Sequence, residues 1–227
     1  MTARAAVILA AGQGTRMKSP IPKLLHKVGG RTLLDWVIDT VQAAGCEKII
    51  VIVGNHSPGV RELAVRRLGE GAVAVQDPPL GTAHAVLAAQ EALADFDGDV
   101  LVTNGDCPLL KASDLEPLFA QRAAGAELAI MGFKPVDGLL YGRLIMGADG
   151  HVIRVVEPKD ATEEELAVKA CNAGMYCADR AQLFAWLSRV DNKNAKGEYY
   201  ITSIVGFATA EEKKVKVAFA PESAVMG

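Results

Sequence analysis

Three apolar runs, separated by helix-like segments, constrain the fold of this chain more than any other feature. They are residues 5–9, "KIIVIVGN" and the strand-like "DVLVTNGD", and the second is apolar at nearly every position, as a strand covered on both faces requires. Helical periodicity begins at Thr32 and recurs around residues 60–68 and at about 82–94. A strand-like segment, "AVAVQ", lies between the second and third of these helical segments. The alternation predicts an α/β fold with a Rossmann-like, mostly parallel sheet flanked by helices.

The pattern changes after about residue 125. "GRLIMGADGHVIRVVE" predicts a β-hairpin that turns at Asp149-Gly150, and a polar helix near 162–168 follows it. A strand "CNAGMYC", a helix around Trp186 and a last helix and strand through "VKVAFA" complete the chain. We expect this second half to form a smaller lobe that contains the hairpin, faces the substrate and extends from the same sheet. Since no Pro/Gly/Ser-rich linker separates the halves, residues 1–227 are predicted to form one domain.

The composition excludes several classes of partner. The 227 residues carry 24 basic and 27 acidic side chains without a long run of either sign, so binding to nucleic acid or to a membrane surface is not expected. The first residues lack a signal-peptide pattern and no segment has the length of a membrane span, which predicts a cytoplasmic protein. The four cysteines show no metal or disulfide spacing and are predicted to be core residues.

A glycine-rich turn, "LAAGQGTRM", follows the first predicted strand and indicates phosphate binding. The dinucleotide fingerprint fails because Met17 occupies its third glycine position, and no Gly-Lys-Ser/Thr follows for a P-loop. Two cations remain, Arg16 in the turn and Lys23 in "SPIPKLL", whose prolines stiffen the segment. Small residues let backbone N–H groups approach an oxyanion, so the pattern favours a triphosphate. The alternative is an ordinary β–α turn with solvated cations.

With "PKLLH", the turn resembles the sugar-nucleotide pyrophosphorylases, and the histidine is typical of the bacterial N-acetylglucosamine-1-phosphate uridyltransferases. Further motifs follow in family order over essentially the whole chain: "QDPPLGTAHA", "NGDCPLL", "YGRLI", "VVEPKDAT", "CNAGMY" and "GEYYIT". The resemblance implies a nucleotide-diphospho-sugar transferase fold. It also implies a reaction of UTP with N-acetylglucosamine 1-phosphate that gives UDP-N-acetylglucosamine and pyrophosphate, for peptidoglycan and lipopolysaccharide precursors.

In this reaction the sugar phosphate attacks the α-phosphorus of UTP in line, so catalysis requires positioning and charge stabilisation rather than a protein nucleophile. Arg16 and Lys23 are the candidate catalytic residues. Asp106 ends the strand "DVLVTNGD", at the sheet edge where α/β proteins place their ligands, and is the candidate ligand of a Mg²⁺ cofactor. The alternative for Asp106 is a turn cap ahead of Pro108.

The resemblance also implies the substrate contacts. Gln76, Gly81 and Thr82 are expected around the uracil, whose imide edge suits a glutamine amide. Gly142, Glu157 and Asn172 are expected to contact the sugar, with Tyr200 and Thr202 as the lower wall of its pocket; each would alone more often be structural. The remaining expected contacts are Leu9, Ala10, Ala11, Gly12, Gly14, Thr15, Lys23, Asn104 and Gly105.

Departures from the family pattern qualify these expectations. Pro79 stands where relatives often carry glutamine, and Ser203 replaces a common aspartate. The sequence ends at "SAVMG", before the family's second metal ligand and its β-helical acetyltransferase half, so we expect weakened Mg²⁺ affinity and no acetyltransferase activity. The family trimer is built largely by that other half, which makes a monomer plausible here. The alternatives are a nucleotidyltransferase for another sugar or polyol phosphate, a non-catalytic nucleotide-binding module and, least favoured, a dehydrogenase.

Overall fold

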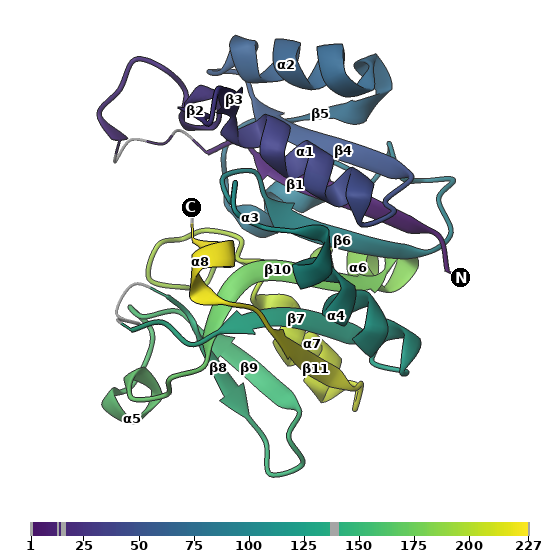
Figure 1. Ribbon diagram of the computed structural model, residues 1–227. Coiled ribbons are helices and arrows are strands. Elements are labelled where there is room, and N and C mark those ends of the chain that lie inside the picture. The colour runs from purple at the N-terminus through teal and green to yellow at the C-terminus, as the bar shows by residue number, and fades with distance from the viewer. Residues whose placement is uncertain (1, 13, 15–16, 137–140, 227) are drawn as a thin grey trace.

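One twisted sheet organises the molecule (Figure 1). The computed structural model describes residues 2–12, 14, 17–136 and 141–226. Within these residues the main path of the sheet has the order β11-β7-β10-β6-β1-β4-β5, and β10 is antiparallel to both of its neighbours on that path while the other pairs are parallel. The bounds are β1 Arg4–Ala10, β4 Lys48–Gly54, β5 Val73–Gln76, β6 Asp99–Asn104, β7 Leu128–Phe133, β10 Cys171–Asp179 and β11 Val215–Phe219.

Helices cover both faces of the sheet. One face packs against α1 (Leu33–Ala43), α2 (Pro58–Leu68), α4 (Ala112–Ala123) and the short α8 (Glu222–Val225). The other packs against α3 (Thr82–Leu87), α6 (Arg180–Leu187) and α7 (Ser203–Ala210). Alternate residues of β1 enter the two cores, which explains why this run is apolar at every position. Figure 1 looks onto the face that α1 and α4 cover.

Smaller elements complete the fold. The strands β8 (Arg143–Met146) and β9 (Val152–Val156) form the predicted hairpin, and β2 (Lys27–Val28) and β3 (Arg31–Thr32) form a separate two-stranded sheet. Two 3₁₀ helices, η2 (Lys23–Leu25) and η3 (Glu70–Ala72), and the helix α5 (Glu163–Leu166) lie in the connections. The hydroxyl of Thr32 caps α1 by accepting a hydrogen bond from Asp35 N, and Thr162 caps α5 in the same way.

The predicted α/β fold is confirmed, with three differences. The helix expected over 82–94 ends at Leu87, and the chain continues in turns in which most N–H groups bond three residues back. Ala89 and Leu93 of this segment are still buried in the core, so the apolar pattern there reflects packing rather than a continued α-helix. The second half contributes β7, β10 and β11 to the main path of the sheet, and the hairpin branches from that path where β8 pairs with β10. The elements α4 and β7 were not predicted. All four cysteines are buried and free, as expected.

Candidate active site

The glycine-rich turn begins where β1 ends. Ala10 and Ala11 are buried, Leu9 is partly exposed and Gly12 is exposed. Gly14 has φ +60°, and a Cβ atom there would lie 2.7 Å from the Cβ of Lys23, so the turn can lie against this lysine only because position 14 is glycine. Thr15 and Arg16, two of the predicted phosphate-binding residues, lie outside the described residues.

Lys23 and Asp106 meet beside this turn. Lys23 opens η2, and its Nζ lies 2.6 Å from Oδ2 of Asp106, with both side chains about a quarter exposed. Asp106 follows the end of β6, the neighbour of β1 in the sheet, and Gly105 N donates a 3.0 Å hydrogen bond to Leu9 O. The parallel pairing therefore brings the phosphate turn and the candidate metal ligand to one sheet edge.

The predicted base-binding residues are joined by hydrogen bonds. The buried Gln76 donates from Nε2 to Gly81 O at 2.9 Å, and the same nitrogen lies 3.2 Å from His84 Nδ1. Gly81 has φ +121°, and a Cβ there would lie 2.6 Å from Tyr199 O. Position 81 therefore requires glycine for its backbone angle and for the close approach. His84, the histidine of the motif "QDPPLGTAHA", therefore lies in contact with the Gln76 amide.

The segment 80–83 is also tied to residues 199–201. Tyr199 N donates to Leu80 O at 2.8 Å, and Ala83 N donates to Tyr199 O at 2.8 Å. The hydroxyl oxygen of Thr82 accepts a 3.0 Å hydrogen bond from Ile201 N. The fold thus links the predicted base-binding segment directly to the backbone around Tyr200.

Three predicted sugar contacts lie near one another: Gly142 just before β8, Glu157 just after β9 and Asn172 at the start of β10. Asn172 N donates to Gly142 O at 2.8 Å. A Cβ atom at Gly142 would lie 3.2 Å from Cγ1 of Val155 and 3.4 Å from Oε1 of Glu157, so position 142 lies close to this carboxylate. Glu157 and Tyr200 line one cavity of about 310 Å³, together with Arg154, Val155, Val156, Asp160, Lys193 and Asn194. Thr202 is buried at the start of α7 and is not among these lining residues.

The cavity carries charged groups of both signs, two carboxylates from Glu157 and Asp160 and two cations from Arg154 and Lys193. Burial raises the pKa of Glu157, Lys196 opposes the shift, and Asp160 and Glu198 add to it. Burial, reinforced by Glu198, Glu157 and Asp160, raises the pKa of Tyr200 to about 12, so its phenol keeps its proton. The Lys196 ammonium lies 6.0 Å from the centre of the Tyr200 ring. Such a lining suits a ligand with hydroxyl and amide N–H donors.

Asn104, at the end of β6, anchors the neighbouring strand. Its Nδ2 donates to Ala173 O at 3.1 Å, and a Cβ at Gly174 would lie 3.0 Å from the same nitrogen. Since Asn104 ends β6 and Asp106 lies two residues further along the chain, this contact links the β10 segment that carries Asn172 to the strand end next to the candidate metal ligand.

A metal at this edge would rest on few protein ligands. In the part of the chain that the structure describes, no cluster of three or more His, Cys, Asp or Glu side chains is placed to hold a metal. Asp106 is a partly exposed single carboxylate. Mg²⁺ usually keeps several waters and is held by one or two carboxylates with substrate phosphates, so one carboxylate beside a phosphate turn fits this ion.

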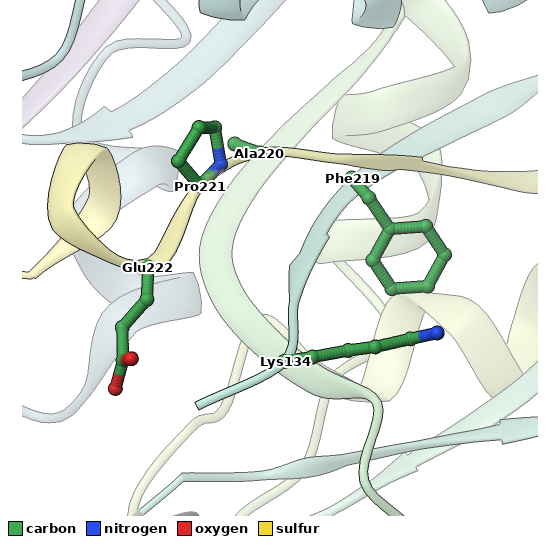
Figure 2. A pocket seen from close by; sticks show the side chains of 5 residues that line it. All are labelled: Lys134, Phe219, Ala220, Pro221 and Glu222. Atoms are coloured by element: carbon green, nitrogen blue, oxygen red, sulfur yellow. The ribbon is translucent and has the colours of Figure 1, made fainter. Parts of the chain in front are cut away.

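A second cavity, of about 340 Å³, is lined by Lys134, Phe219, Ala220, Pro221 and Glu222 (Figure 2). The Lys134 ammonium lies 5.4 Å from the centre of the Phe219 ring. None of the predicted site residues lines this cavity.

Comparison with known proteins assigns the family. Residues 6–170 match the MobA-like NTP transferase domain. The chain belongs to this family. It is 57% identical over 225 residues to the bifunctional protein GlmU of Caulobacter vibrioides, covering 99% of this chain and 48% of that protein. It is 47% identical over 224 residues to GlmU of Maricaulis maris, covering 99% and 49%. The chain thus spans about half the length of these curated relatives.

The family match and the GlmU relatives confirm the resemblance read from the motifs and the class of nucleotidyltransferase. A crystal structure of UDP-glucose pyrophosphorylase complexed with UDP-glucose superposes with a TM-score of 0.75 at 18% identity, covering 96% of this chain and 90% of that one. At this identity the likeness confirms the predicted fold. Within residues 2–12, 14, 17–136 and 141–226, no helix is both long and apolar enough to cross a membrane.

Proposed function

We propose that this domain transfers a uridylyl group from UTP to N-acetylglucosamine 1-phosphate and releases pyrophosphate. The observation that carries the proposal is the 2.6 Å pairing of Lys23 with Asp106, which joins the phosphate turn after β1 to the carboxyl end of β6. The similarity to GlmU proteins supports the choice of substrates. The proposal treats residues 1–227 as one domain and assigns no acetyltransferase step to them.

The chemistry follows from the charges. An oxygen of the sugar phosphate attacks the α-phosphorus of UTP, a P–O bond forms, and the bond to pyrophosphate breaks, so the protein needs no nucleophile of its own. Negative charge grows on the departing pyrophosphate. Lys23, fixed at the start of η2 and against Gly14, is positioned to offset it. Arg16 is proposed to assist from the turn.

Gln76 is proposed to read the uracil. Its amide nitrogen is held by Gly81 O and lies beside His84, so the acceptor Oε1 is the atom that we assign to the ligand. The imide N–H of uracil is a donor that suits this acceptor, whereas cytosine has no hydrogen on the corresponding ring nitrogen. This arrangement supports UTP over CTP.

The cavity lined by Glu157 and Tyr200 is proposed to hold the sugar. Its carboxylates, Glu157 and Asp160, can accept hydrogen bonds from hydroxyls. Asn172 is not among the lining residues, and we propose that it adds an amide from the neighbouring Gly142 segment, to which its backbone N–H is bonded. Asp106 is proposed to hold Mg²⁺, which supplies charge neutralisation at the triphosphate when bound. The Asp106 carboxylate is paired with the Lys23 ammonium. We propose that, when Asp106 holds the ion, the Lys23 ammonium contacts the phosphates of UTP instead.

A pyrophosphate-release assay with UTP, N-acetylglucosamine 1-phosphate and Mg²⁺ tests the function. We expect turnover that depends on Mg²⁺ and exceeds that with CTP, or with glucose 1-phosphate, by at least about tenfold, since a missing hydrogen-bonding group leaves buried partners unpaired. No turnover at high Mg²⁺, combined with reaction of another sugar phosphate, would overturn the choice of substrate. Binding of the UDP-sugar in calorimetry without any turnover would instead indicate a non-catalytic nucleotide-binding module.

A further inference from the structure

The strand β10 has a bulge beside the proposed sugar pocket. Asn172 pairs with Gly132 of β7 and Tyr176 pairs with Ile130, so four steps along β10 face only two along β7. Gly174, inside the bulge, has φ +75°, a backbone angle that favours glycine. The extra residues bend the strand where Asn172 is presented.

The bulge brings Tyr176 to the side chain of Asn172. In a regular strand, residues four apart lie about 13 Å from one another, too far for a hydrogen bond between these side chains. Here Nδ2 of Asn172 donates to the Tyr176 hydroxyl oxygen at 2.7 Å, and Gly174 N donates to Oδ1 of Asn172 at 3.0 Å. Because a backbone N–H can only donate, the oxygen of the amide must face Gly174 and its nitrogen must face the tyrosine.

Tyr176 is fully buried, with a relative exposure of 0%, and packs in the core with Val102 and Ile130. Burial of the ring requires only an apolar side chain, and a phenylalanine would fill nearly the same volume. A buried hydroxyl is costly unless it is hydrogen-bonded, and this one accepts a hydrogen bond from the Asn172 amide. The hydroxyl therefore has a role at Asn172 that packing does not explain.

We propose that Tyr176 is a positioning residue that fixes the amide of Asn172 for the sugar substrate; this inference rests on the proposed function. With one N–H donated to Tyr176 and one lone pair occupied by Gly174, the half-buried amide keeps one N–H and one lone pair for a ligand. That pair of groups matches an N-acetyl amide or neighbouring hydroxyls. A fixed amide offers them without the entropy cost of ordering the side chain on binding.

The variant Tyr176→Phe removes the hydroxyl and keeps the ring. We expect the KM for N-acetylglucosamine 1-phosphate to rise about three- to tenfold, as for loss of one hydrogen bond, with the KM for UTP unchanged. Asn172→Ala should raise the same KM at least as much. The double variant Tyr176→Phe/Asn172→Ala should match Asn172→Ala alone, because the hydroxyl acts through the amide.

The outcomes distinguish the positioning role of Tyr176 from the sugar pocket assigned under the proposed function. A rise in KM for Asn172→Ala without one for Tyr176→Phe overturns the role of Tyr176 alone. An unchanged KM for Asn172→Ala overturns the sugar pocket, and the positioning role with it. A merely structural tyrosine would raise both KM values together and add to Asn172→Ala. In NMR spectra of the unsubstituted protein, the side-chain NH₂ of Asn172, assigned by its loss in Asn172→Ala, should exchange slowly with water; fast exchange overturns the proposal even if Tyr176→Phe fails to fold.

Discussion

The Nζ atom of Lys23 lies 2.6 Å from a carboxylate oxygen of Asp106, although 83 positions separate the two residues in the chain. The pairing exists because β1 and β6 are parallel neighbours whose carboxyl ends meet at one edge of the sheet. Each charge stabilises the other before any nucleotide binds. The arrangement also places a cation and a candidate metal ligand where a triphosphate would need both.

Lys23→Ala tests the cation. We expect kcat for pyrophosphate release to fall about 100-fold, as when one preorganised group that stabilises transition-state charge is removed. Lys27, which lies four residues further on and is exposed, provides the matched control, and Lys27→Ala should leave kcat unchanged. Equal activity of the two variants would remove Lys23 from the catalytic residues.

Asp106→Ala tests the metal ligand. Loss of the Asp106 carboxylate should lower Mg²⁺-dependent turnover at least about 100-fold, and added Mg²⁺ should restore little of it. Asp95→Ala removes an exposed aspartate outside the site and should behave as the unsubstituted protein. A Mg²⁺ titration of initial rates makes the comparison; unchanged turnover in Asp106→Ala would contradict the assignment.

Gly81→Ala tests the close backbone contact between the proposed base-binding segment, residues 80–83, and residues 199–201. A Cβ atom at φ +121° would meet backbone atoms of Tyr199 at 2.6 and 2.7 Å, so we expect a loss of about 2 kcal/mol or more in the free energy of unfolding. If the variant folds, its KM for UTP should rise because Gln76 bonds to Gly81 O. Gly206→Ala, at an exposed helical position with no atom within 4 Å, should stabilise by about 0.5–1 kcal/mol. Urea unfolding measures both.

Glu157→Gln tests the buried carboxylate of the sugar cavity through the pH dependence of stability. Burial raises the pKa of Glu157 above its ordinary 4.5 in the folded protein, so the folded state binds more protons than the unfolded state once the pH exceeds that value. Stability should therefore fall as pH rises from 4.5 through the raised pKa, and Glu157→Gln should remove this part of the fall. Unfolding free energies from about pH 4 to about pH 8 measure it. A pH profile identical to that of the unsubstituted protein would contradict the burial of this carboxylate.

The same variant should raise the KM for N-acetylglucosamine 1-phosphate about tenfold or more, since hydrogen bonds to charged groups are the stronger ones. Glu163→Gln, which makes the same charge change at an exposed position in α5, should leave that KM unchanged.

Arg67→Gln tests the ion pairs between α1 and α2. Burial would raise the pKa of Asp35 and Asp39, but hydrogen bonds and charge from Arg67, with Thr32 at Asp35 and Arg31 at Asp39, outweigh it and lower both. The stabilisation should be present above the ordinary value of 3.8 and should disappear as pH falls through the lowered pKa values. At neutral pH we expect a loss of about 1 kcal/mol, because the groups are partly exposed. Acid unfolding curves that keep the same difference at all pH values would contradict the ion pairs.

The sequence by itself determined the elements whose residues are decided locally. Continuous apolar runs predicted β1, β4 and β6, and Thr32 marked the start of α1 because its hydroxyl caps the helix. The motif order also identified the family. The sequence prediction missed α4 and β7, although Leu115, Leu118 and Phe119 have helical spacing and "LAIMGF" is a buried run. At the end of α3 the apolar periodicity continues into turns, because buried residues such as Ala89 and Leu93 keep an apolar pattern without a helix.

Only the tertiary structure decided how the site residues meet. No local pattern connects Lys23 with Asp106, Gln76 with His84, or Thr82 with Ile201, because strand order and long-range backbone hydrogen bonds create these contacts. Tyr176 appeared in the sequence as one more apolar-strand residue within "CNAGMYC". Its contact with Asn172 depends on a bulge that a period-2 strand pattern cannot predict, since the extra residues appear only when β10 is paired against β7.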